Sequence, residues 1–224
     1  MAKRKSKPVS QEPEIVRRDG ALCVTFVNTV STERPALETY ADLLAWGRRS
    51  GALTPSQAER LGRVADGEPD QARAVLTRAQ TLRGCLLSIF HAIAEGGSPA
   101  DFDVEALDHS LYEVLAHRRL IAADDGRCQF VWREGDELDR MLWPVLTSAT
   151  RTLTSKHCRE IRECASEGCS LMFLDRSSGS PRKWCSQKTC GHRDRSRRHY
   201  RKTVKTNRAR AEEASRRKKK RKES

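Results

Sequence analysis

The sequence predicts a mainly α-helical protein, in which a helical N-terminal domain with two short β-strands precedes a small C-terminal module that ends in a basic helix. Three observations support this prediction. Apolar residues recur at helical spacing over most of the segment from 39 to 153. Four of the eight cysteines fall within 164–190. The segment 151–224 holds 24 Lys and Arg against 8 Asp and Glu.

The charge of the chain is distributed unevenly. The formal net charge is +13, yet residues 19–150 hold 13 basic and 20 acidic side chains, so the positive excess lies at the two ends. Such asymmetry favours a partner with negative charge, usually nucleic acid, although the run 216–222 could instead be a solvated tail. No apolar run approaches the roughly 20 residues that a membrane span needs, and the N-terminus lacks the apolar segment of a secretory signal. We therefore expect a cytoplasmic, nucleoid-associated protein with no membrane partner.

The first elements follow from local patterns. Residues 1–18 are polar, basic and without periodicity, which predicts a disordered basic tail. Residues 21–30 alternate and are rich in β-branched side chains, which is typical of a strand. A helix is expected from about Thr39, with its C-cap near Gly51.

A second helix is expected to begin at Thr54, with Thr54 as N-cap, Pro55 at the first position and Gln57 completing a capping box, and to end near Gly67. A long helix over 70–95 and another over 101–119 should follow, separated by Gly and Pro residues.

The body is expected to close with a strand and a helix. The strand 128–134 follows the turn residues 124–126 and could pair with 21–30. The last helix covers 138–153, where Pro144 is expected to introduce a kink. The change of composition after Leu153 places the end of this body, residues 19–154, before the cysteines.

The clustered cysteines Cys164, Cys169, Cys185 and Cys190 have the spacing C-x4-C, fifteen residues, C-x4-C. Zinc prefers four ligands in a tetrahedron, and four cysteines close its coordination shell, so the sequence predicts a structural Zn²⁺ rather than a catalytic one. Free thiols or disulfides are the alternatives, and His157, His192 and His199 are rival ligands. The chain shows no hydrolase, protease or phosphate-loop motif, so we do not expect an enzyme.

The module around these cysteines, residues 155–207, is expected to be a treble-clef-like zinc finger. Residues 171–174 fit one strand of a hairpin that returns at 183–184, and Phe173 and Trp184 would form a miniature core. A unit this small cannot fold on apolar burial alone, so the metal would supply folding free energy.

A basic helix is expected after Ser186, which is a good N-cap. Phosphate contacts are the expected role of its side chains and of the basic residues before it, and base reading by Arg193, Arg195 or Arg197 is a further alternative. A solvated helix without a partner is the other interpretation. The predicted nucleic-acid-binding residues are Arg182, Lys183, Lys188, Arg193, Arg195, Arg197, Arg198, Arg201, Lys202 and Lys205. Residues 208–224 are expected to be a polybasic tail.

At these residues the sequence resembles the bacterial family of CGNR zinc-finger proteins with an N-terminal ABATE domain. The finger resemblance rests on the four cysteines, on Phe173, Asp175, Ser177 and Trp184-Cys185-Ser186, and on Cys190-Gly191-His192-Arg193, where His192 replaces the family Asn. Upstream, 22–29, 42–53, 79–90 and 142–150 look like landmarks of the first domain. The resemblance covers about 20–205 and implies a mainly helical first domain and a regulator of transcription.

The expected function is therefore a DNA-binding transcriptional regulator, whose body senses a signal or dimerises. An RNA-binding or ribosome-associated protein is the alternative. A small-molecule effector and a second copy of the chain are further candidate partners. Asn28, Arg83 and Trp143 are candidates for a ligand pocket, although Asn28 could end a strand, Arg83 could lie at the surface and Trp143 could belong to the core.

Overall fold

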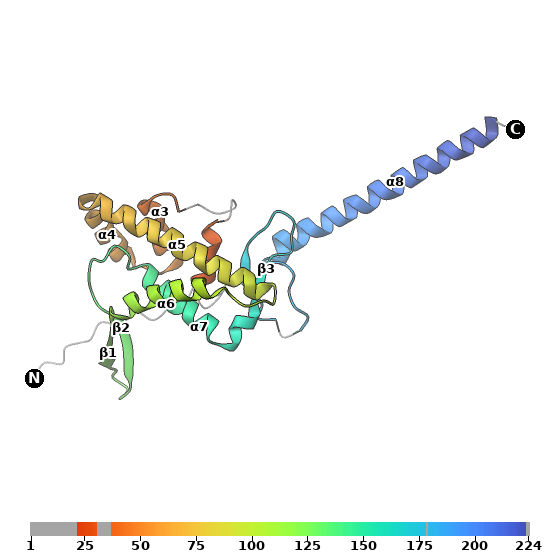
Figure 1. Cartoon of the computed structure of the whole chain (residues 1–224). Helices are drawn as coiled ribbons and strands as arrows, with labels where there is room; N and C mark the ends of the chain where they lie inside the picture. Colours follow the sequence, from red (N-terminus) through yellow and green to blue (C-terminus); the bar gives the residue numbers. More distant parts are fainter. Residues whose placement is uncertain (1–21, 31–36, 178, 223–224) are drawn as a thin grey trace, which may run out of the picture.

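The computed structural model describes residues 22–30, 37–177 and 179–222, so the predicted N-terminal tail 1–18 lies outside the described residues. The helices are α2 (Leu22–Val27), α3 (Tyr40–Ser50), α4 (Pro55–Gly67), α5 (Pro69–Ala94), α6 (Asp101–Leu115), α7 (Leu142–Leu153) and α8 (His192–Lys222). The strands are β1 (Arg118–Ala122), β2 (Cys128–Trp132), β3 (Ile161–Glu163) and β4 (Met172–Leu174), with short turns η1 (Asn28–Val30), η2 (Lys156–Glu160) and η3 (Gln187–Gly191). The predicted mainly helical class is thus confirmed (Figure 1). Among the described residues, no helix is both long and apolar enough to cross a membrane.

The segment predicted as the first strand is helical. Over 22–30 the chain forms α2 and η1, and the expected pairing with 128–134 does not occur. Leu22 and Phe26 lie one turn apart and are both buried. The backbone N–H of Cys23 donates to the hydroxyl of Ser148 on α7 at 3.2 Å. Periodicity does not separate a short buried strand from a buried helix, and here packing against α7 favours the helix.

The predicted C-cap of α3 and the predicted N-cap of α4 are confirmed, and α3 has in addition an N-terminal capping box that was not predicted. The Thr39 hydroxyl accepts from the N–H of Asp42, whose carboxylate accepts from the N–H of Thr39 in return. Thr54 and Gln57 form the same reciprocal box on α4. Gly51 ends α3 in the left-handed conformation, with φ 76°, which favours glycine. These ends follow from local chemistry alone.

The core of the body lies where α2, α5 and α7 meet, and it includes the fully buried side chains of Phe26, Phe90 and Trp143. Helix α7 begins at Leu142, four residues later than the prediction. Pro144 therefore falls in the first turn, where its missing N–H costs no helical hydrogen bond, and the expected kink is not needed.

The strand predicted at 128–134 is confirmed as β2, but its partner is β1. Helix α6 stops at Leu115, and residues predicted as its last turn begin β1 instead. The two strands pair antiparallel, with Leu120 opposite Phe130. Gly126 has φ 79° in the connecting turn, so the turn residues that the sequence showed close a hairpin of adjacent strands.

The finger hairpin also differs from the prediction. Strand β4 covers the expected residues, but it pairs antiparallel with β3, which precedes the cysteines, and not with the 183–184 segment. Ile161, Met172 and Leu174 explain the choice, since all three are buried in the core of the body. The hairpin is therefore held by the body as well as by its own ladder.

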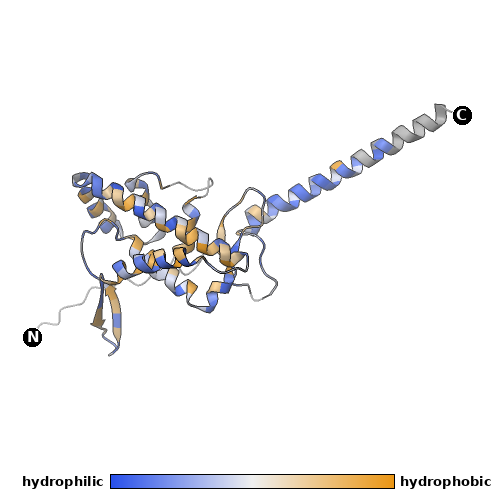
Figure 2. Cartoon of the chain, in the orientation of Figure 1, coloured by the Kyte–Doolittle hydropathy of each residue, from blue (hydrophilic) through white to orange (hydrophobic). Residues whose placement is uncertain are grey.

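The basic helix follows η3 and is much longer than expected. Ser186 caps η3 by accepting from the N–H of Thr189, as predicted. Helix α8 then runs for 31 residues to Lys222, through the segment predicted as a tail. It projects away from the body (Figure 1), and Figure 2 shows that most of its described residues are hydrophilic.

Candidate metal centre and basic helix

The four clustered cysteines meet at one point. The Sγ atoms of Cys164, Cys169, Cys185 and Cys190 all lie within 4.8 Å of one another. The Sγ atom of Cys185 is 3.9 Å from that of Cys169 and 3.6 Å from that of Cys190. A tetrahedral zinc ion with Zn–S bonds of about 2.3 Å would place its sulfurs about 3.8 Å apart. The donor set and its spacing thus fit a structural zinc ion.

Two turns present these cysteines. Cys164 directly follows β3, and its N–H donates to the carbonyl of Leu171 at 3.0 Å, which extends the hairpin by one bond. The turn then reverses at Gly168, with φ 77°, before Cys169. Of the second pair, Cys185 precedes the capped turn η3 and Cys190 lies within it. The N–H of Cys185 donates to the Sγ of Cys164 at 3.4 Å. This bond links the two turns directly.

The thiols influence one another's protonation. Burial raises the pKa of Cys169 to about 11 and also raises the pKa of Cys185. Burial opposes ionisation of Cys190 too, but hydrogen bonds from the neighbouring thiols lower its pKa. Zinc binds the thiolate form of cysteine, so a bound ion would displace these protons. Because the four thiols come together only in the folded module, the free energy of zinc binding would contribute to the free energy of folding.

A miniature core surrounds the cysteines, as predicted. Phe173 is buried with Cys164 and Cys190, and Trp184 packs against them. Gly191 is buried beside Trp184, and a Cβ at this position would lie 3.4 Å from the indole and collide with the side chain of Gln187. A side chain at this position would therefore require the Gln187 side chain to move.

The rival histidines lie outside the cysteine group. His157 pairs with Glu160, with Nδ1 2.8 Å from a carboxylate oxygen. His192 and His199 are exposed on α8. In the described part of the chain, the four cysteines form the one group of at least three His, Cys, Asp or Glu side chains suited to a metal ion.

Several predicted nucleic-acid-binding arginines are engaged within the protein. Arg182 donates to the carbonyl of Leu174 at 3.1 Å and lies over the Phe173 ring at 4.8 Å. Arg198 pairs with Asp194, one turn earlier, at 2.9 Å. Arg193 is half-buried and also makes an interaction within the protein.

Glu167, in the turn between Cys164 and Cys169, was not anticipated from the sequence. Its carboxylate pairs with Arg197 and Arg201 at 3.2 Å each, and its carbonyl accepts from Arg197 at 2.9 Å. The first zinc turn thereby neutralises part of the predicted basic stripe of α8. An isolated glutamate in a polar turn gives no sequence signal for such a pairing.

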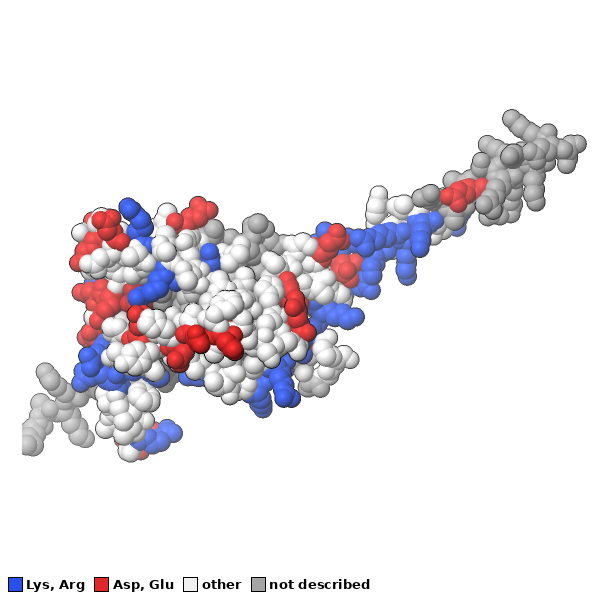
Figure 3. All heavy atoms as spheres, viewed as in Figure 1, with Lys and Arg blue, Asp and Glu red and all other residues white. Residues whose placement is uncertain are grey.

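The remaining basic residues of the predicted set are exposed. Within the described residues, their side chains make no ion pair or hydrogen bond to the protein: Lys183, Lys188, Arg195, Lys202 and Lys205. Figure 3 shows basic side chains along α8 where it leaves the body, and acidic ones spread over the visible face of the body.

The three candidate pocket residues each contact other parts of the protein. Asn28 is buried, and its side chain makes two bonds to the backbone of Met172, accepting from the N–H at 2.8 Å and donating to the carbonyl at 2.9 Å. Arg83 donates to the hydroxyl of Thr29 at 3.2 Å. Trp143 is fully buried and stacks on His117, with ring centroids 4.1 Å apart. Asn28 therefore joins the body to strand β4 of the finger.

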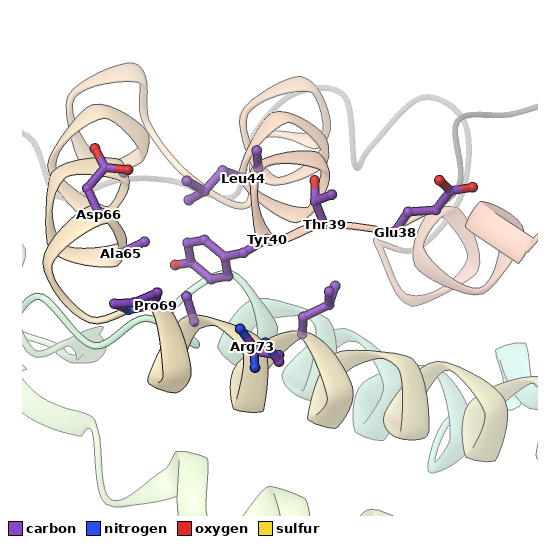
Figure 4. Close-up of a pocket in the computed structure, with 12 residues that line it drawn as sticks. Glu38, Thr39, Tyr40, Leu44, Ala65, Asp66, Pro69 and Arg73 are labelled. Atoms are coloured by element: carbon purple, nitrogen blue, oxygen red, sulfur yellow. The ribbon is translucent and has the colours of Figure 1, made fainter.

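Two cavities of the body lie elsewhere. A cavity of about 570 Å³ lies among α3, α4 and α5, and Figure 4 shows Tyr40 between Leu44 and Ala65 within it. Both Asp66 and Arg73 contribute to its lining. A second cavity, of about 640 Å³, lies at the opposite end of α5, next to η2 and β3. None of the three candidate pocket residues lines either cavity.

Two family models match the chain. The ABATE model, described as "Putative stress-induced transcription regulator", matches residues 20–156. The CGNR zinc finger model matches residues 160–203, which include all four clustered cysteines. No curated protein matches the chain. The resemblance that the sequence suggested is therefore confirmed in both halves.

Proposed function

The chain belongs to the ABATE family and carries a CGNR zinc finger, and we propose that it regulates transcription by binding duplex DNA through α8. The observation that carries this proposal is a long basic helix that starts at the zinc site and extends away from the body (Figure 1). At 1.5 Å per residue its 31 residues span about 46 Å. An α-helix of this kind fits the major groove of DNA.

Four basic residues of α8 share one face; Arg198 among them is paired with Asp194, and the other three make no ion pair within the described residues. Arg195, Arg198, Lys202 and Lys205 recur at i, i+3, i+7 and i+10, which is the spacing of one side of a helix. Arg197 and Arg201 lie along the edge of this face, where Glu167 pairs with them. We therefore assign the main phosphate contacts to this face, with Lys183 and Lys188 beside the zinc site.

The zinc ion has a positioning role in this proposal. Cys185 precedes the turn η3, and Cys190 lies within it, two residues before α8 begins, so a bound metal would fix the direction in which α8 leaves the finger. Residues 19–150 hold 13 basic and 20 acidic side chains, and Figure 3 shows acidic side chains on the body and basic ones along α8, which favours an approach of DNA from the helix side.

RNA binding is a second candidate, favoured by one observation. Tyr200 is 70% exposed on α8, and an exposed aromatic ring among basic residues can stack on unpaired bases. Duplex DNA offers no such bases. Comparing the two nucleic acids on the same protein separates the candidates.

The test measures binding of the zinc-loaded full chain to labelled duplex DNA and to single-stranded RNA across a salt series. We expect tighter binding to the duplex, and a double Arg195→Ala, Lys202→Ala variant should lower the slope of log affinity against log salt by about 1.8. A double Arg48→Ala, Arg63→Ala variant is the matched control, since it removes the same charge from exposed positions of the body.

Full duplex affinity in the α8 double variant would overturn the assignment to this helix. Tighter binding to RNA, lost on Tyr200→Ala, would establish the second candidate instead.

A further inference from the structure

The cavity of about 640 Å³ lies where the body meets the finger. Its apolar wall comes from α5, α6 and α7 and includes Ile93, Leu107 and Leu153. Its polar wall comes from the segment that leads into the cysteines and contains Arg159 and Arg162. Its volume lies within the range of about 300–1,000 Å³ that small-molecule sites occupy.

Arg159 and Arg162 both have N–H donors that make no hydrogen bond to the described residues. Arg159 is exposed, and within the described residues its guanidinium makes no ion pair or hydrogen bond. Arg162 is half-buried and uses one terminal nitrogen on backbone carbonyls, those of Arg159 at 2.8 Å and Ile161 at 2.9 Å. A guanidinium has five N–H donors in a planar fork that suits a carboxylate, so both side chains can still bind an anion.

Acidic groups do not compete for these arginines. No Asp or Glu is among the described residues that line the cavity. The two nearest acids along the chain are engaged elsewhere: Glu160 pairs with His157 at 2.8 Å, and Glu163 pairs with His91 at 3.3 Å. The other cavity differs, because its lining mixes carboxylates with an arginine (Figure 4).

We propose that the junction cavity binds a small amphipathic carboxylic acid. The carboxylate pairs with Arg159 and Arg162, and the apolar part of the acid lies against Ile93, Leu107 and Leu153. The surrounding structure supplies the two features that such a ligand needs, which are a mostly apolar hollow and unpaired cationic donors on one side of it.

This site lies at a point where a ligand can affect the finger. The two arginines flank Ile161, which is fully buried and begins β3. Cys164 follows that strand directly. A bound acid would therefore join the helices of the body to the segment that carries the first zinc ligand.

The test titrates the zinc-loaded full chain with octanoate, and with 1-naphthoate to distinguish acyl from aromatic acids, by calorimetry without DNA. Octanol is the neutral control. We expect saturable binding of at least one acid with a single site per chain, about tenfold or more tighter than octanol, which is the order expected for charge-assisted hydrogen bonds. The measurement is independent of nucleic-acid binding, so the two proposals can fail separately.

Three variants locate the site. Arg159→Gln should weaken acid binding about tenfold and leave folding intact, because this side chain is exposed. Val104→Trp should abolish binding, since Val104 is 47% exposed and lines the cavity. Lys156→Gln is the matched control: it removes one charge from the same η2 turn, outside the cavity, and should change nothing.

Absence of saturable binding by both acids, or equal binding of octanol, would overturn the proposal. Unchanged affinity in Arg159→Gln and Val104→Trp would also overturn it. Loss of binding on Arg73→Gln alone would assign the acid to the other cavity instead.

Discussion

The body and the finger are stabilised in different ways. The body buries large apolar side chains such as Phe26, Phe90 and Trp143 completely, in one continuous core. Around the finger's metal site the buried cluster consists of Phe173, Cys164 and Cys190. Burial of apolar side chains can stabilise the body without a metal, whereas the apolar cluster of the finger is too small and the finger depends on zinc.

The division between residues stabilised by apolar burial and residues organised by zinc differs from the division between the two family matches. Strands β3 and β4 belong to the finger in sequence, yet Ile161, Met172 and Leu174 lie in the core of the body. Asn28 adds two hydrogen bonds across the same junction. The finger thus has a part that the body holds and a part, from Cys164 onward, that the zinc ion organises.

Removal of zinc should have the largest effect of the changes considered, and it should disturb the zinc-organised part of the finger but not the body. Chelation should reduce DNA affinity by about 100-fold or more, because it releases the start of α8 and lets the zinc turns open. Amide hydrogen exchange should rise sharply in the zinc turns and stay low in α5 and α7. Cys190→Ser should behave like chelation, while Cys128→Ser, which changes an exposed cysteine outside the cluster, should not.

Loss of protection in α7 together with the zinc turns would show that the metal stabilises the whole chain, and would remove the distinction drawn between the two regions.

Removal of the two hydrogen bonds between Asn28 and the backbone of Met172 should have the next largest effect. Asn28→Ala leaves the N–H and carbonyl of Met172 without partners in a buried place, and should cost about 2–4 kcal/mol of unfolding free energy. Asn28→Asp keeps an acceptor for the N–H but opposes the carbonyl, so it should also destabilise. Urea unfolding at fixed zinc concentration measures the loss. An unchanged urea midpoint for Asn28→Ala would mean that these hydrogen bonds do not stabilise the fold.

A smaller effect is expected from removal of the Asp42 carboxylate, which belongs to the capping box of α3. Hydrogen bonds from the side chain and backbone of Thr39 lower the pKa of Asp42. The charged cap therefore stabilises the fold above the ordinary Asp pKa of about 3.9, and this contribution is lost as the pH falls through the lower folded value. Asp42→Ala should cost about 1 kcal/mol at neutral pH, and the difference from the parent should shrink below about pH 4.

Gln57→Ala is the matched control, because Gln57 closes an equivalent box on α4 without a charge. Its cost should not follow the titration of a carboxyl group. Parallel pH dependence for the two variants would rule out ionisation of Asp42 as the cause.

The sequence predicted features that depend on neighbouring residues and missed those that depend on distant ones. The capping box at Thr54, the C-cap at Gly51 and the cysteine quartet are local patterns, and they are present as expected. The helix at 22–27 and the pairing of β3 with β4 are decided by burial in a core that other segments build. For the same reason Asn28 could be selected as unusual, but its partner Met172, 144 positions away, could not be named.

Glu167 provides the smallest and most specific test of the comparison, because it joins the zinc turn to α8. Its carboxylate is 70% exposed, so its pairs with Arg197 and Arg201 should each contribute under about 1 kcal/mol. Glu167→Gln frees both guanidiniums and removes a negative charge beside the proposed DNA face. Duplex affinity should therefore rise severalfold, about 3-fold to 10-fold, with a steeper salt dependence. Glu59→Gln, an equivalent change at an exposed position on α4, should leave the affinity unchanged, and weaker DNA binding by Glu167→Gln would show that the pairs position α8 rather than compete with phosphate.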